Sequence, residues 1–230
     1  MRTLPSPLLA VTDRHGRARP LTETVQAIVE GGGRWIWFRD RDLEPEARLR
    51  LGEAVAACVR AAGGFLTVGG DVALARVLGA DGLHLGGGSG PEAIAAAREA
   101  LGAGALIGVS AHAPHEVAQA AKAGADYVTL SPIFPTASKP GYGPALGPEG
   151  IVAARRFGLP VVGLGGIDPA RIAECHAAGA AGVAVMGGLM RTGDPAAAAQ
   201  ALLEAWGYQV SCDPDGKGPA QRGSHPYPSS

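Results

Sequence analysis

The chain has 230 residues, of which 47% are hydrophobic and 18% are charged, and its formal net charge is −1. This composition excludes a disordered chain and argues against a non-specific nucleic-acid binder, which needs an excess of basic side chains. The three cysteines form no CxxC pair and no apolar stretch of about 18 residues occurs, so we expect no zinc ribbon, disulfide framework or membrane span. The proline-broken start is untypical of a signal peptide, and we expect a cytoplasmic protein.

Short apolar runs alternate along the chain with longer, Ala-rich segments of helical character. The apolar runs predict eight strands, at residues 8–12, 35–38, 65–68, 82–85, 105–110, 126–131, 160–164 and 182–186. The intervening segments predict eight helices, at residues 21–30, 46–62, 71–78, 91–101, 114–122, 148–157, 169–178 and 195–206. Eight strand–helix units indicate a single (β/α)8 TIM barrel. The alternative is an open doubly wound sheet, whose glycine fingerprint is absent after the first strand.

The predicted barrel accounts for residues 1–207. Residues 208–230 lack periodicity and are rich in Pro, Gly and Ser, so we expect them to form a flexible C-terminal tail without a role in the site.

In a TIM barrel the site lies at the carboxyl ends of the strands. Two glycine pairs, Gly165-Gly166 and Gly187-Gly188, follow the seventh and eighth predicted strands. Glycine lets backbone N–H groups approach an anion, and barrels often bind phosphate at these two loops. We therefore predict a phosphate site there; the alternative is that both pairs are plain tight turns.

Cationic side chains follow the second and sixth predicted strands. Arg39 and Arg41 come after the second strand, and Lys139 comes after the sixth with Thr136 and Ser138 as neutral donors nearby. Guanidinium groups bind phosphate oxygens through paired donors, so these residues are candidate phosphate ligands. The alternative for residues 39–42 is a self-compensated surface cluster of alternating charges.

Candidate proton-transfer groups lie at the fourth and fifth strands. Ser110 and His112 stand at the end of the fifth strand, where His112 is well placed to act as a base. His84 lies inside the fourth strand, and it is interpreted either as a buried structural histidine or as a second catalytic candidate.

Several segments together resemble one known family. They read AVTDR at 10–14, FRDR at 38–41, ADGLHLG at 80–86, GVSAH at 108–112, LSPIFPTASKP at 130–140 and VGLGGI at 162–167. In order and spacing they are similar to the thiamine phosphate synthase and TenI (thiazole tautomerase) superfamily, over about residues 8–206.

The synthase branch joins a pyrimidine pyrophosphate to a thiazole phosphate and releases pyrophosphate with the help of magnesium. The resemblance implies that pyrophosphate is held by Arg39, Arg41, Ser110 and Lys139. It also implies that the thiazole phosphate is held by Thr136, Ser138 and the backbone of Gly166 and Gly187.

The chain departs from the synthase pattern where that pattern binds metal. Gly69 and Gly70 align with the Asn-Asp after the third strand, and only Asp71 follows as a candidate metal ligand. Residues 87–89 (Gly-Gly-Ser) align with the Gln-x-Asp after the fourth strand, and Trp37 aligns with the glutamine that reads the pyrimidine.

The TenI branch needs no metal and often carries Arg-x-Arg after the second strand, as here. Its base, a histidine, aligns with Ser131 or Pro132, so His112, with Ser110 and His84, is the substitute. We therefore expect a metal-independent thiazole tautomerase acting on a small phosphorylated thiazole. The alternatives are a magnesium-dependent synthase and a non-catalytic binder of a phosphorylated ligand. No nucleic-acid or membrane partner is expected, and a homo-oligomer is left open.

Overall fold

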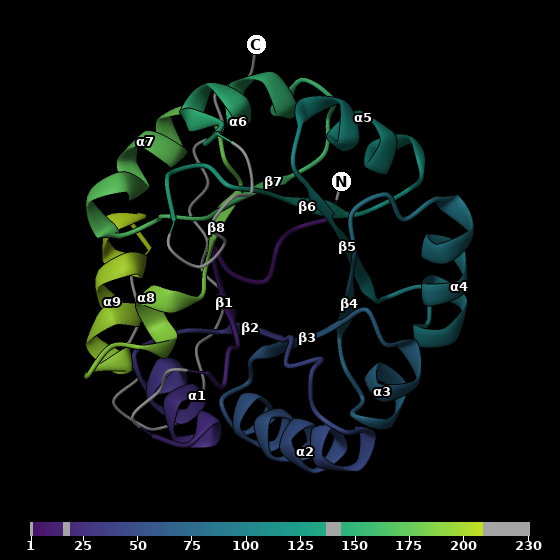
Figure 1. Cartoon of the computed structure of the whole chain (residues 1–230), viewed down its shortest axis with the longest axis vertical. Coiled ribbons are helices and arrows are strands. Elements are labelled where there is room, and N and C mark those ends of the chain that lie inside the picture. The colour runs from purple at the N-terminus through teal and green to yellow at the C-terminus, as the bar shows by residue number, and fades with distance from the viewer. Residues whose placement is uncertain (1, 16–18, 137–143, 209–230) are drawn as a thin grey trace.

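The computed structural model describes residues 2–15, 19–136 and 144–208. Within them, eight parallel strands close into a barrel in sequential order, and the helices surround the ring of strands (Figure 1). The strands are β1 (Leu8–Val11), β2 (Trp35–Phe38), β3 (Phe65–Gly69), β4 (Gly82–Leu85), β5 (Leu106–Ala111), β6 (Tyr127–Leu130), β7 (Val161–Leu164) and β8 (Gly182–Val185). The predicted (β/α)8 barrel is confirmed. The pairing of Leu9 in β1 with Ala184 in β8 closes the ring and excludes the open sheet.

Eight α-helices and one short 3₁₀ helix follow the strands, and a ninth α-helix completes the described chain. They are α1 (Leu21–Glu30), α2 (Pro45–Ala61), α3 (Val72–Val77), α4 (Pro91–Leu101), α5 (Pro114–Lys122), α6 (Gly147–Arg155), η1 (Pro169–Arg171), α7 (Ile172–Ala177), α8 (Gly187–Met190) and α9 (Pro195–Ala205). Proline occupies the first turn of α2, α4, α5 and α9, where its missing N–H costs no hydrogen bond.

Two segments differ from the sequence prediction. The segment expected as one helix at 169–178 begins as the 3₁₀ turn η1, with Asp168 as its N-cap, before α7. The four-residue helix α8 was not predicted, because one turn containing two glycines has neither periodicity nor a polar cap to announce it.

The strands are buried on both faces, which explains their continuous apolar sequences. Alternate residues point into the barrel, where Trp35, Trp37 and Tyr127 form part of a separate inner cluster. The inner space is filled by pairing large residues with small ones: a Cβ on Gly108 would lie 2.2 Å from the Tyr127 ring and 2.5 Å from Nδ1 of His84. Gly108 therefore makes room for two polar aromatic groups on the barrel axis.

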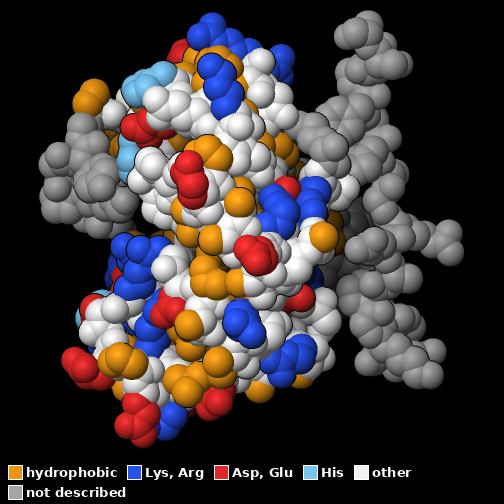
Figure 2. Space-filling view, turned by 90° about the vertical axis from the view of Figure 1, so that its right-hand side faces the viewer, with side chains coloured by type: hydrophobic (Ala, Val, Ile, Leu, Met, Phe, Trp, Pro, Cys, Tyr) orange, Lys and Arg blue, Asp and Glu red, His pale blue; other side chains and the backbone are white. Residues whose placement is uncertain are grey.

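The outer surface gives little indication of a docking site. The face in Figure 2 mixes acidic, basic and apolar side chains. Over the described ranges, the large hydrophobic side chains that are exposed are Val77, Val152 and Tyr208, which lie on separate elements. None of the described helices is long and apolar enough to cross a membrane. The expected tail lies outside the described residues from position 209 onward.

Candidate functional site

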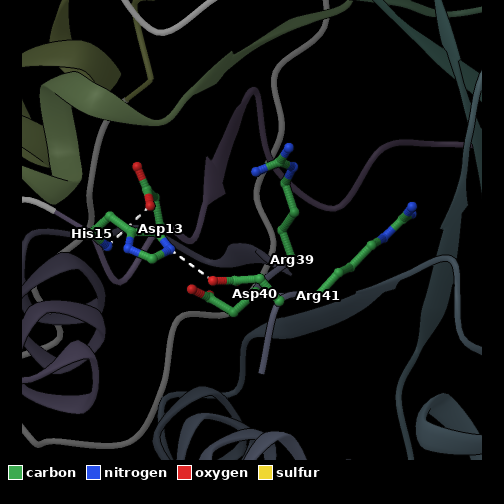
Figure 3. A pocket seen from close by; sticks show the side chains of 6 residues that line it. Asp13, His15, Arg39, Asp40 and Arg41 are labelled. Carbon is green, nitrogen blue, oxygen red and sulfur yellow. Dashed lines mark hydrogen bonds and ion pairs between the residues drawn. The ribbon is translucent and has the colours of Figure 1, made fainter. Parts of the chain in front are cut away.

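A cavity of about 330 Å³ opens at the carboxyl ends of β1 and β2. Its walls are the side chains of Asp13, His15, Arg39, Asp40, Arg41 and Asp42. Figure 3 shows Arg39 and Arg41 leaving the same loop in different directions, both away from Asp40, with Asp13 and His15 on the opposite side. The structure thus brings both predicted arginines to one cavity at the end of the barrel where the site is expected.

Asp40 holds the two loops of this cavity together. Its buried carboxylate accepts the Thr12 hydroxyl at 2.5 Å and the backbone N–H of Arg14 at 2.8 Å. The Thr12 oxygen in turn accepts the backbone N–H of Arg39 at 2.9 Å. These bonds fix the backbone from which the two arginines extend, and they occupy both oxygens of Asp40.

The other acids at the cavity are also committed to partners. Asp13 pairs with Arg191 at 2.7 Å, and Asp42 accepts from Arg14 and from Nε2 of His15. The hydrogen bond from His15 is the main cause that lowers the pKa of Asp42. Among the described residues, Asp40 and Asp42 form no ion pair with Arg39 or Arg41, and Asp42 pairs with Arg14 outside that run.

The turn after β3 carries Gly69, Gly70 and Asp71. Asp71 is the N-cap of α3: one oxygen accepts the Leu74 N–H at 2.9 Å and the other accepts Nη1 of Arg48 at 2.7 Å. Arg48 also donates to the Gly69 carbonyl at 3.1 Å. Both oxygens of Asp71, the one acid expected near a metal, are thus engaged.

His84 lies at the centre of the barrel and is fully buried. Its Nδ1 is 3.0 Å from the Tyr127 hydroxyl, and its Nε2 is 3.1 Å from both the Ser110 and Thr129 hydroxyls. The rings of Trp37 and His84 have centroids 4.0 Å apart. Burial, and to a lesser degree the positive charge of Arg41, lower the pKa of His84 to about 3. These contacts favour the structural interpretation of His84 over a catalytic one.

His112 is half-buried beside the end of β6. Its Nδ1 lies 2.8 Å from the Ser131 carbonyl oxygen, which can only accept, so Nδ1 carries the proton and Nε2 the lone pair of the neutral ring. Its backbone N–H donates to Glu116 at 2.7 Å, which fixes the start of α5. The tautomer and orientation of His112 are compatible with a base, and that role remains a prediction.

The two predicted glycine turns lie at the ends of β7 and β8. Among the described residues, no acceptor is assigned to the backbone N–H groups of Gly165, Gly166, Gly187 or Gly188. Gly166 has a φ of +64°, and a Cβ there would lie 2.5 Å from the Pro135 carbonyl oxygen. The first turn therefore needs glycine for a structural reason, and its role in binding an anion stays a prediction.

Two arginines flank these turns. Arg171 donates to the Gly166 carbonyl at 2.5 Å, and its guanidinium lies 4.8 Å from the centre of the Phe134 ring. A Cβ on Gly187 would lie 2.4 Å from the guanidinium of Arg191, which therefore packs against the second turn. Arg171 and Arg191 were missed from the sequence. The position of Arg191, immediately after the second turn and α8, is the signal that could have found it.

Of the remaining candidates, Thr136 is the last described residue before a gap in the β6–α6 loop. Ser138 and Lys139 fall at 137–143, outside the described residues, so their predicted contacts stay predictions.

Comparison with known proteins decides the family. The model of the thiamine monophosphate synthase family matches residues 8–189. A putative thiamine-phosphate synthase of Geobacter sulfurreducens is 40% identical over 198 residues, 85% of this chain and 92% of that one. A thiamine-phosphate synthase of Roseiflexus castenholzii is 39% identical over 196 residues, 84% of this chain and 85% of that one. The chain belongs to the thiamine monophosphate synthase family. A solved thiamine phosphate pyrophosphorylase of Pyrococcus furiosus superposes with a TM-score of 0.76 at 28% identity, covering 87% of this chain and 95% of that one.

Membership of the thiamine monophosphate synthase family confirms the resemblance and places the chain among enzymes of thiamine biosynthesis. The named relatives are synthases rather than tautomerases. These names support the synthase alternative better than the tautomerase that we expected from the sequence.

The magnesium that synthases of the thiamine monophosphate synthase family imply does not fit the donors of this chain. Magnesium prefers carboxylate oxygens in octahedral geometry. Gly69 and Gly70 supply none, both oxygens of Asp71 are engaged, and the Ser89 hydroxyl donates to the Gly86 carbonyl. Across the described ranges, no three His, Cys, Asp or Glu residues are grouped to hold a metal ion.

Proposed function

We propose that this chain joins a pyrimidine pyrophosphate to a thiazole phosphate and releases pyrophosphate, as a thiamine-phosphate synthase. The observation that carries the proposal is that one end of the barrel presents two separate groups of donors suited to anions. The guanidinium groups of Arg39 and Arg41 line the β1–β2 cavity, and the backbone donors of the glycine turns lie at β7 and β8. Two anion-binding regions suit a reaction that brings together two phosphorylated substrates.

The glycine turns suit the thiazole phosphate. The backbone N–H groups of the two turns have no acceptor among the described residues, and barrels often bind phosphate after strands seven and eight. Arg171 holds the Gly166 carbonyl and Arg191 packs on Gly187, so both turns are fixed before a ligand arrives. By family resemblance, Thr136 and Ser138 add contacts to this phosphate.

The arginine cavity suits the pyrophosphate. Among the described residues, no acceptor is assigned to the guanidinium of Arg39 or to the two Nη groups of Arg41. The carbon–oxygen bond that breaks leaves its electron pair on the departing pyrophosphate, and fixed cations stabilise that developing charge. By resemblance, Lys139 and Ser110 complete this region.

A specific observation keeps the tautomerase as a second candidate. His112 has a defined tautomer at the mouth of the barrel, with Nδ1 held by the Ser131 carbonyl. A proton shift in a thiazole phosphate carboxylate needs a phosphate anchor and one base within hydrogen-bond reach, and it needs no metal.

Two assays of the purified chain separate these functions. Thiamine phosphate is measured by chromatography after mixing pyrimidine pyrophosphate with thiazole phosphate, and aromatisation of the thiazole phosphate carboxylate is followed separately. We expect thiamine phosphate in the first assay. Activity only in the second, lost in His112→Asn and kept in the exposed control His115→Asn, would replace the synthase by the tautomerase. Inactivity in both assays would contradict an enzymatic role and favour a binding protein.

A further inference from the structure

The side chain of Arg41 lies across the turn that follows β3. Its Nε donates to the Gly69 carbonyl at 3.2 Å. A Cβ on Gly70 would lie 2.3 Å from Nη2 of Arg41 and 2.7 Å from its Cζ, and the φ of Gly70 is +60°. The guanidinium therefore occupies the space that any side chain at position 70 would enter.

Asp71, the acid next to Gly70 in the sequence, binds other groups with both of its carboxylate oxygens. Arg48 is buried, and it binds both the carboxylate of Asp71 and the carbonyl of Gly69. Asp71 also caps α3 through the Leu74 N–H. The turn thus presents a guanidinium in the position where a carboxylate would be needed to hold a cation.

The cavity is lined by two arginines and three aspartates, but Asp13 pairs with Arg191 and Asp42 pairs with Arg14. Asp40 accepts hydrogen bonds only from neutral groups, and no carboxylate of the described residues forms an ion pair with Arg39 or Arg41. Burial, and then the positive charges of Arg39 and Arg48, lower the pKa of Arg41. A bound polyanion would relieve this repulsion, whereas a divalent cation would add to it.

We propose that the guanidinium of Arg41, with Arg39 beside it, takes the place of a divalent metal ion, so that this chain binds a pyrophosphate group without metal. The inference rests on the proposed function, because it concerns the pyrophosphate region of that site. Anchoring through Nε leaves the two Nη groups of Arg41 to donate in parallel to phosphate oxygens, which is the strong geometry for such pairs. Gly70 is the residue that makes this replacement sterically feasible.

The test is calorimetric titration of inorganic pyrophosphate into the full chain in excess EDTA, with magnesium titrated alone in a parallel experiment. We expect pyrophosphate to bind in EDTA and magnesium alone to give no binding heat. Arg41→Ala should weaken pyrophosphate binding about tenfold or more. Arg41→Lys keeps the positive charge but loses the paired guanidinium donors, so its affinity for pyrophosphate should lie between those of the wild type and Arg41→Ala. Arg50→Ala is the matched control: it removes one positive charge from an ion pair with Glu46 on the outer helix α2, and should bind like the wild type. Circular dichroism melting verifies that each variant is folded.

Pyrophosphate binding that requires magnesium, or a folded Arg41→Ala variant with wild-type affinity, would overturn the inference. These outcomes are distinct from failure of the proposed function. Metal-independent binding through Arg41 without any formation of thiamine phosphate would support the inference while refuting the synthase.

Discussion

Asp40 shows how one buried carboxylate can control a whole cavity. It accepts from Thr12 on β1 and from the Arg14 backbone, and it lies between the two arginines in the sequence. A buried donor that loses its acceptor costs about 1–3 kcal/mol. We therefore expect Asp40→Ala to lower the free energy of unfolding by about 2 kcal/mol, measured by urea denaturation, and to weaken pyrophosphate binding.

The matched control for this prediction is Asp42→Ala. Asp42 is exposed and contacts Arg14 and His15 at the surface, where such contacts add little to stability. Equal losses of stability in the two variants would show that Asp40 has no special role in holding the loops.

His84 predicts a pH dependence of stability. Its pKa is about 3 in the folded chain against an ordinary value of 6.5, so below pH 6.5 the unfolded chain binds a proton that the folded chain does not. The contribution of His84 to the free energy of unfolding is full above pH 6.5 and is lost progressively as the pH falls toward 3. Between about pH 7.5 and pH 5.5, this residue alone should lower the free energy of unfolding by about 1.4 kcal/mol.

Urea denaturation at the two pH values measures this loss. His84→Gln should be less stable at neutral pH, because a satisfied buried network is broken, yet it should lose less stability on acidification. The exposed His115→Gln should keep the wild-type pH dependence. An unchanged pH dependence in His84→Gln would mean that other groups cause the acid sensitivity.

For single residues, the sequence predicted the positions of those that directly follow a strand. Arg39, Arg41 and the glycine turns were placed at the mouth of the barrel in this way, because parallel strands present their carboxyl ends at one edge. Arg48 could not be found, because it lies in a helix and reaches Asp71 and Gly69 only after α2 packs on the barrel.

At the scale of elements, the repeated pattern of apolar runs and Ala-rich helices was sufficient for all eight strands. The errors fall on elements of about one helical turn, namely α8 and the 3₁₀ turn η1. Their conformation is imposed by neighbouring loops rather than by their own sequence. The loop after β6 contacts the turn after β7 in this way: the backbone N–H of Phe134 donates to the Gly165 carbonyl at 3.0 Å.

The close packing of Gly166 against Phe134 and Pro135 leads us to expect that Gly166→Ala is destabilising. A left-handed conformation costs alanine about 1–2 kcal/mol, and the clash with the Pro135 carbonyl adds about 1 kcal/mol or more. Gly158→Ala is the matched control, since Gly158 has a φ of +74° but open space around its Cβ position. We expect chemical denaturation to show the larger loss in Gly166→Ala, and titration with inorganic phosphate to show weaker binding in that variant alone. Equal losses of stability would indicate that the loop moves aside freely.

At the scale of the whole molecule, the number of strand–helix units predicted a closed barrel, and the structure confirms it. The open sheet was the alternative, and the pairing of β1 with β8 excludes it. Closure also explains why the overall charge was a poor guide to the site. It gathers strand ends from the whole chain at one mouth of the barrel, where Arg39 and Arg41 line a cavity in a nearly neutral molecule.

This contrast between local and overall charge predicts how salt affects binding. A net charge of −1 offers almost no long-range attraction for pyrophosphate, so the electrostatic part of binding must come from the arginine cavity. Raising the ionic strength from about 0.05 M to about 0.5 M shortens the Debye length to about 4 Å and screens that attraction. We expect the affinity of the wild-type chain for pyrophosphate to fall across a calorimetric salt series, and Arg41→Ala to fall less steeply because one interacting charge is gone. The control Arg50→Ala changes the net charge equally but should keep the wild-type slope. If its slope changed as much as that of Arg41→Ala, the salt effect would reflect total charge, and the cavity would have no distinct electrostatic role.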